Sequence, residues 1–148
     1  MTEGPHSSRV GIILLVEDNQ NDLVLTQAAF KRTKLAVDLY HVENGRQCLD
    51  FLRKRGPYAG TPMPDLVLLD LNMPLMDGRE ALQELVADDS LRHLPVVILT
   101  TSSAEKDILD MYKLRCSSYI IKPIDFNQFV RIIDEITNYW FSVVALPS

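Results

Sequence analysis

Short apolar runs recur along the chain and predict the strands of a sheet. The runs cover residues 12–16, 36–42, 66–69, 96–99 and 118–121. They are rich in Val, Ile and Leu and are bounded by polar or turn residues, as buried strands are. Three of the runs are almost continuously apolar, which favours parallel strands with both faces covered.

The segments between these runs have helical patterning and predict helices at about 20–33, 45–55, 78–87, 104–115 and 126–144. Ser102 and Glu105 have the spacing of a capping box, and Asp125 followed by Gln128 indicates another helix start. The segment GPYAGTPMP, residues 56–64, is expected to be only a loop. Strands that alternate with helices in this way predict an α/β domain with a parallel sheet.

Length and composition favour one globular domain. The chain has 148 residues, of which 47% are apolar and 24% charged, an ordinary balance for a soluble fold. We expect a flexible tail at residues 1–9 and a single domain at 10–148 that ends in an extended C-terminal helix and tail. Cys48 and Cys116 are expected to be buried free thiols of a reducing compartment.

Charge and hydropathy limit the possible partners. The net charge is −5 and no run of five basic residues occurs, so a nucleic-acid partner is not indicated. The apolar run at 10–16 is too short for a membrane span, and acidic residues follow it where a signal peptide needs a cleavage site. We therefore expect a cytoplasmic protein with no membrane partner.

Polar residues stand where four of the five runs end. Glu17 and Asp18 follow the first run, Asp70 the third, Thr100 lies at the end of the fourth, and Lys122 follows the fifth. In an open parallel sheet, the loops after the carboxyl ends of the strands surround the functional crevice. Each residue alone has an ordinary explanation, such as a helix cap or a solvated surface group. Together, they indicate a site.

The chemistry of this group favours a cation and a phosphoryl group. If the strands bring Glu17, Asp18 and Asp70 together, their negative charges repel unless a cation lies between them. Oxygen ligands without nearby His or Cys favour Mg²⁺, or Mn²⁺, over zinc. Lys122 and Thr100 would contact a phosphoryl group from the other side. Such a site suits phosphoryl transfer onto an aspartate.

The same residues, in this order, resemble the receiver domain of two-component response regulators. The matching segments are Glu17 and Asp18 after the first strand, Asp70 in LLDLNMPLMDG, Thr100 in LPVVILTT and Lys122 in SYIIKP. The resemblance covers residues 10–139. Within the family, the segments GPYAGTPMPDL, TTSSAEKD and NYWFSVVALP are most similar to the stand-alone receivers that partner cyanobacterial phytochrome histidine kinases.

The resemblance implies a flavodoxin-like three-layer sandwich, with a five-stranded parallel sheet of order 2-1-3-4-5 and five helices. It also implies a cis peptide bond between Lys122 and Pro123, which an X-Pro bond permits at modest energy.

The resemblance further implies a role for each site residue. Asp70 would be the phosphoacceptor, and Glu17 would act on the metal through a water. Tyr119 would be a switch aromatic whose ring turns inward after phosphorylation; the alternative is an edge-strand tyrosine half buried against the last helix. The remaining roles are Mg²⁺ binding by Asp18, Asp70 and the backbone carbonyl of Asn72, phosphoryl pairing by Lys122, and phosphoryl binding and relay by Thr100.

The function implied is that of a single-domain response regulator. It would accept a phosphoryl group from a phosphohistidine of a sensor kinase, a phytochrome by the narrower resemblance, and signal through changed protein contacts with an unknown downstream protein. The alternative is a phosphorelay intermediate. It would not be an enzyme, although it would promote its own phosphorylation and dephosphorylation.

Two other classes fit the sequence less well. A haloacid-dehalogenase-type phosphatase also forms an aspartyl phosphate, but it needs a second Asp two residues later, where this chain has Asn72. A flavin-binding domain needs a phosphate-cradling loop after the first strand, where the segment EDNQND would repel a phosphate.

The last predicted helix has more apolar surface than one sheet requires. One stripe, sufficient to cover a sheet, consists of Phe129, Ile133, Ile136, Trp140 and Val144. The excess predicts a homodimer surface, formed by Ile132, Ile136, Tyr139, Trp140, Phe141 and Val143. The alternative is a tail that folds back and buries these residues.

Overall fold

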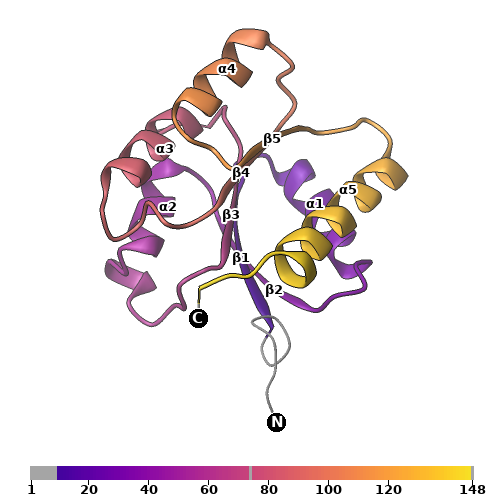
Figure 1. Ribbon diagram of the computed structural model, residues 1–148, viewed down its shortest axis with the longest axis horizontal. Helices are drawn as coiled ribbons and strands as arrows, with labels where there is room; N and C mark the ends of the chain where they lie inside the picture. The colour runs from indigo at the N-terminus through magenta and orange to yellow at the C-terminus, as the bar shows by residue number, and fades with distance from the viewer. Residues whose placement is uncertain (1–9, 74, 148) are drawn as a thin grey trace.

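The computed structural model describes residues 10–73 and 75–147. The described residues form a five-stranded sheet of order β2-β1-β3-β4-β5, in which every pairing is parallel (Figure 1). Its strands are β1 (Gly11–Val16), β2 (Val37–Val42), β3 (Leu66–Leu69), β4 (Val96–Thr100) and β5 (Ser118–Ile121). The predicted strand order and strand positions are confirmed.

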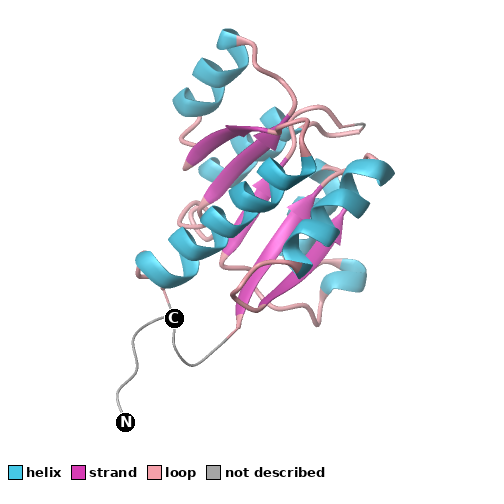
Figure 2. Cartoon of the chain, turned by 90° about the vertical axis from the view of Figure 1, so that its right-hand side faces the viewer, coloured by secondary structure: helices cyan, strands magenta, loops and turns pink. Residues whose placement is uncertain are grey.

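Helices cover both faces of the sheet. Helices α2, α3 and α4 lie on one side and α1 and α5 on the other, and the strand arrows point the same way (Figures 1 and 2). The bounds are α1 (Gln20–Lys31), α2 (Gly45–Leu52), α3 (Gly78–Ala87), α4 (Glu105–Lys113) and α5 (Phe126–Asn138). The arrangement is the three-layer sandwich that was predicted.

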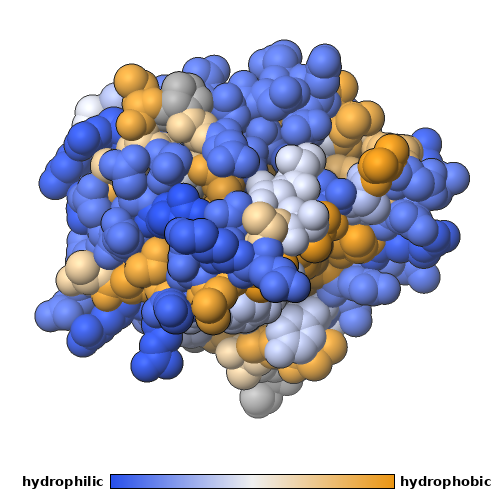
Figure 3. Space-filling model, turned by 90° about the horizontal axis from the view of Figure 1, so that it is seen from above, coloured by the Kyte–Doolittle hydropathy of each residue, from blue (hydrophilic) through white to orange (hydrophobic). Residues whose placement is uncertain are grey.

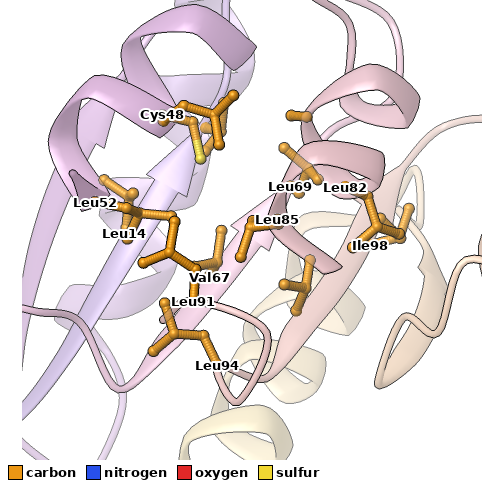
Figure 4. Close-up of a cluster of buried hydrophobic side chains, with 14 of the residues drawn as sticks. Leu14, Cys48, Leu52, Val67, Leu69, Leu82, Leu85, Leu91, Leu94 and Ile98 are labelled. Carbon is orange, nitrogen blue, oxygen red and sulfur yellow. The ribbon is translucent and has the colours of Figure 1, made fainter. Parts of the chain in front are cut away.

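The core consists of two clusters, one on each face of the sheet. Val67 and Leu69 of β3 pack beneath α2 and α3, whereas Leu66 and Leu68 belong to the cluster beneath α1 and α5. Figure 4 shows the first cluster, with Val67 and Leu69 facing leucines of the helices. Successive strand side chains point to opposite faces. Continuous apolar runs such as β3 therefore fill both layers at once.

The helix ends differ from the predicted ones. Helix α1 ends at residue 31 rather than 33, and α2 ends at residue 52 rather than 55. Lys54, just after α2, has φ of 57°, a left-handed conformation that terminates helices. The segment predicted to be only a loop contains a 3₁₀ turn, Gly56–Tyr58. Pro57 suits this position because the backbone amides in the first turn of a helix have no partner inside the helix, so the N–H that proline lacks is not missed.

One predicted helix cap is confirmed and another is wrong. Asp125 caps α5 by accepting a hydrogen bond from the Gln128 amide at 3.3 Å. Helix α4 begins after Ala104, which makes no side-chain cap. Ser102 stands two residues earlier and donates instead to Asp107, at 2.7 Å.

The predicted cis bond before Pro123 is also wrong, since no peptide bond among residues 10–73 and 75–147 is cis. The predicted tail at residues 1–9 lies outside the described residues. Cys48 and Cys116 are buried free thiols, as predicted. No helix in the described part of the chain is long and apolar enough to cross a membrane.

The C-terminal tail folds back onto the sheet. Helix α5 ends at residue 138 rather than 144 and continues as a π-helical turn, Tyr139–Val143. The ring of Phe141 lies directly over Gly11 of β1, so closely that a Cβ at Gly11 would overlap it. Leu146 is buried further along. Part of the apolar excess of this segment therefore covers its own domain.

A test of this fold lies at Gly78, the first residue of α3. A Cβ placed there would overlap the backbone carbonyl of Asp70, and the Gly78 amide donates to the Leu71 carbonyl at 2.9 Å. We expect Gly78→Ala to lower the free energy of unfolding by about 1–3 kcal/mol, because the backbone must shift. Urea unfolding measures the change. Gly60→Ala, where no heavy atom lies within 4 Å of the added Cβ, is the control and should match the wild type. Equal stability of all three proteins would contradict the close approach.

Candidate functional site

The predicted acidic residues meet at the carboxyl ends of β1 and β3. These strands are neighbours, with Val16 paired to Leu69, so the residues that follow them leave the sheet side by side. One carboxylate oxygen from each of Glu17, Asp18 and Asp70 lies within 4.8 Å of the other two. The sheet thus places three anionic groups at one edge, although they come from distant parts of the sequence.

Asp70 is held firmly by the backbone around it. Its amide donates to the Val16 carbonyl at 3.2 Å, and its Oδ1 accepts from the Leu71 amide at 2.8 Å. The residue is 9% exposed. Its Oδ2 makes no hydrogen bond to any residue that the structure describes, so this oxygen is available to an external group.

Glu17 is the most enclosed of the three acids, at 1% exposure. Burial raises its pKa from 4.5 to about 7, although a hydrogen bond and the positive charge of Lys122 act against this shift. The charge of Asp70 raises the pKa of Glu17 further. Burial and a like charge therefore disfavour the ionised form, and a cation among the three acids would favour it.

Lys122, the residue that follows β5, faces the acids. Its Nζ lies 2.5 Å from Glu17 Oε1 and 3.4 Å from Asp22 Oδ2, and its backbone amide donates to the Thr100 carbonyl at 2.7 Å. Burial alone would lower the pKa of Lys122, but the hydrogen bond to Glu17 and the surrounding acids outweigh it and raise the pKa. The side chain is therefore a firmly charged ammonium group beside the acid cluster.

The predictions from sequence did not include Asp22. It lies in the first turn of α1, where its amide donates to the N-cap Asn19, and an acid at that position has an ordinary explanation in the helix dipole. Its contact with Lys122 depends on the packing of α1 against α5, the helix that follows Lys122 in the chain. Among the described residues, Lys122 forms no ion pair with Asp70, so its partners in this state are Glu17 and Asp22.

Thr100 ends β4, the neighbour of β3, and Tyr119 lies on β5, the next strand along the sheet. Thr100 is fully buried, and its hydroxyl accepts a long 3.5 Å hydrogen bond from the Ser102 amide. Tyr119 packs against the core cluster beneath α2, α3 and α4, and its hydroxyl donates to the Ser102 carbonyl at 2.9 Å. The alternative placement of Tyr119, against the last helix, is wrong. Both residues instead contact Ser102 in the β4–α4 loop.

The β4–α4 loop is also tied to α3 by residues that sequence reasoning missed. Arg79 donates to Asp107 Oδ1 at 2.7 Å, and the other oxygen of Asp107 accepts from Ser102 at 2.7 Å. An Arg near the start of one helix and an Asp near the start of the next carry no sequence signal of contact. Through Ser102, this ion pair is linked to Tyr119.

The predicted dimer residues separate into buried and exposed groups. Ile136 is 5% exposed and packs into the core cluster beneath α1 and α5, so it has little surface left for a partner. Ile132, Trp140 and Phe141 pack partly against the same cluster. Tyr139 and Val143 remain exposed. They line a groove of about 690 Å³ between β5 and the end of α5.

Comparison with known proteins places this geometry in a family. The sequence model of one protein family, the response regulator receiver domain, matches residues 13–134. The chain belongs to the response regulator receiver domain family. Receivers are signalling domains, so the phosphatase and flavin-binding classes are not favoured.

Receivers of phytochrome systems are among the relatives. The chain is 36% identical to the response regulator Rcp1 of Synechocystis sp. over 137 residues, which cover 93% of each protein. The phosphorylated cyanobacterial phytochrome response regulator RcpA superposes with a TM-score of 0.89 at 40% identity, covering 95% of this chain and 100% of RcpA. The Mn²⁺-bound form of Rcp1 gives a TM-score of 0.85 at 36% identity, covering 93% of this chain and 99% of Rcp1. The similarity in each case extends over almost the whole receiver.

The raised pKa of Glu17 predicts a pH-dependent stability for the metal-free receiver. The folded state holds the proton more tightly than the unfolded chain, in which the pKa is 4.5. The stability from this group is therefore complete below pH 4.5 and is lost as the pH rises through about 7. We expect a loss of up to about 3 kcal/mol between pH 4.5 and 8, measured by urea unfolding with a chelator present.

Glu17→Gln is the control for this titration, because an amide has no proton to lose and should flatten the pH profile over the same range. An unchanged slope in Glu17→Gln would show that another group causes the dependence.

Proposed function

We propose that this receiver accepts a phosphoryl group on Asp70 from a phosphohistidine of a sensor kinase. The observation that carries the proposal is the position of Asp70, which is fixed by backbone hydrogen bonds beside two further carboxylates and near an ammonium group. Asp70 attacks phosphorus, the bond from phosphorus to the histidine nitrogen breaks, and that nitrogen keeps the electron pair. The protein's contribution is positioning and charge.

The donor set suits Mg²⁺, with Mn²⁺ as a substitute. Asp18, Asp70 and the backbone carbonyl of Asn72 would hold the ion, and Glu17 would contact it through a water. Three carboxylates meet at this edge of the sheet, and hard oxygen donors are what these ions prefer. A bound ion would neutralise charge that develops on the transferred oxygens.

Lys122, Thr100 and Tyr119 would respond to the phosphoryl group. Lys122 is already charged and buried beside the acids, so it needs only a change of partner from Glu17 and Asp22 to the new phosphoryl oxygens. Thr100 offers a buried hydroxyl with one weak hydrogen bond. Tyr119 shares the contact with Ser102, so a shift of that loop toward the phosphoryl group would free the ring to turn inward.

Similarity to RcpA, a cyanobacterial phytochrome response regulator, supports a phytochrome-type kinase as the partner. A cytoplasmic location is proposed on the sequence grounds given above. The receiver would also promote its own phosphorylation by small phosphodonors and its own dephosphorylation, because the ion and Lys122 act on the same group in both directions. The output is a change of surface that a downstream protein recognises.

A second copy of the chain is the proposed occupant of the groove beside α5. Exposed apolar residues at Tyr139 and Val143 line it, and a symmetric dimer would cover both copies of the groove with the same contacts. Ile136, which is almost buried but lines the groove, and Phe141, which packs partly against the core, would support this surface from beneath.

Phosphorylation is tested with acetyl phosphate and Mg²⁺, followed by intact mass. We expect one added phosphoryl group on the wild type and none on Asp70→Asn, which lacks the nucleophilic carboxylate. Asp89→Asn, at an exposed carboxylate that pairs with Arg92, is the matched control and should be modified like the wild type. An unmodified wild type, or a modified Asp70→Asn, would refute the assignment.

The dimer is tested by sedimentation at tens of micromolar, with and without acetyl phosphate. We expect Val143→Asp to shift the wild-type dimer to a monomer, because a charge would be buried in the interface. Val24→Asp is the matched control, since Val24 is exposed to a similar degree on α1, at 54% against 64% for Val143. A monomeric wild type in both conditions would rule out the interface.

A further inference from the structure

His41, at the end of β2, contacts the backbone of the acid cluster. Its Nε2 lies 2.7 Å from the carbonyl oxygen of Glu17. The Cα of His41 pairs with Leu15 in the sheet, so the ring reaches two residues further along β1, to the point where the chain leaves the sheet. A carbonyl oxygen only accepts hydrogen bonds, and Nε2 therefore carries the proton.

The contact replaces a hydrogen bond of the sheet that is missing at this point. The Glu17 amide donates to the Val42 carbonyl at 3.0 Å, and in a continued parallel ladder the Asn44 amide would donate to the Glu17 carbonyl. Asn44 instead turns away and caps α2 by accepting from the Gln47 amide at 2.9 Å. Among the described residues, no backbone amide donates to the Glu17 carbonyl, and the imidazole takes that place.

The orientation of this peptide matters because it joins two of the acids. The Glu17 carbonyl and the Asp18 amide belong to one planar peptide unit, so a hydrogen bond that fixes the carbonyl also fixes the amide nitrogen and Cα of Asp18. Asp18 is exposed, and its carboxylate makes no hydrogen bond to a described residue. The backbone therefore sets where the Asp18 side chain starts, and no side-chain hydrogen bond within the described residues opposes its repulsion from the neighbouring carboxylates.

We propose that His41 is a positioning residue for divalent-metal binding at Glu17, Asp18 and Asp70. It holds the Glu17–Asp18 peptide by a side-chain hydrogen bond where the sheet no longer does, and so keeps the acids convergent before the ion arrives. This inference rests on the proposed function, since the metal serves phosphoryl transfer to Asp70. Groups that orient metal ligands in this way commonly account for ten- to a hundredfold in metal affinity.

The test compares His41→Gln with His41→Met. The two side chains are similar in length and shape, but only glutamine can donate to the Glu17 carbonyl. Mn²⁺ alone is the probe, and its affinity is measured from the electron paramagnetic resonance signal of free Mn²⁺. We expect His41→Met to weaken binding by about tenfold and His41→Gln to stay within about threefold of the wild type. His93→Met, at an exposed imidazole in a loop, should bind like the wild type.

A second measurement separates positioning from general destabilisation. At Mn²⁺ concentrations that saturate each variant, the rate of Asp70 modification by acetyl phosphate should return to within about twofold of wild type in His41→Met, because the ion itself then holds the acids together. The metal-free melting temperatures of His41→Gln and His41→Met should both lie well above the temperature of the binding assay, so that the affinities compare folded proteins. If methionine disturbs folding, His41→Val repeats the loss of the donor with a residue that favours strands.

Two results would overturn the inference. Equal Mn²⁺ affinity in His41→Met and the wild type would show that the contact does not position the acids. Equally weak binding in His41→Gln and His41→Met would show that the ring, and not its hydrogen bond, is needed. Both differ from failure of the proposed function, in which the wild type itself would bind no Mn²⁺ or resist acetyl phosphate.

Discussion

The site depends on the mutual repulsion of three carboxylates held at one edge of a sheet. Glu17, Asp18 and Asp70 approach within 4.8 Å, and burial lifts the pKa of Glu17 to about 7. Lys122 relieves part of this repulsion by pairing with Glu17 at 2.5 Å. A divalent ion would relieve more of it. The stored repulsion is thus the source of affinity for a cation, and Lys122 is the group free to change partners when a phosphoryl group arrives.

Such repulsion requires a rigid support, which the two-sided core supplies. Strand β3 is buried on both faces, so the residue that follows it cannot move without disturbing leucines in both clusters. Gly78 also lies close against the carbonyl of Asp70, so the peptide that follows Asp70 is confined as well. His41 performs the corresponding task for β1. Rigidity on both sides keeps the acids at short distance.

The response of the site can reach the surface through the β4–α4 loop. Ser102 accepts from the Tyr119 hydroxyl and donates to Asp107, which in turn pairs with Arg79. These contacts join β5, α4 and α3 around one loop that begins beside Thr100. A change of hydrogen bonding at Thr100 would therefore alter contacts on several elements together, whereas Phe141 fixes the C-terminal tail independently against β1.

The sequence by itself determined the strands and the residues at their ends, because burial on both faces leaves a continuous apolar signal. The strand order came from the family resemblance. The sequence also indicated that Asp70 and the Glu17–Asp18 pair belong together. Only the tertiary structure decided that Lys122 pairs with Glu17 and Asp22, that His41 holds the Glu17 carbonyl, and that Ile136 is buried while Val143 is exposed. The reason is physical: apolar periodicity records which face of an element is buried, whereas the partner of a polar side chain depends on distances between elements that no local pattern records.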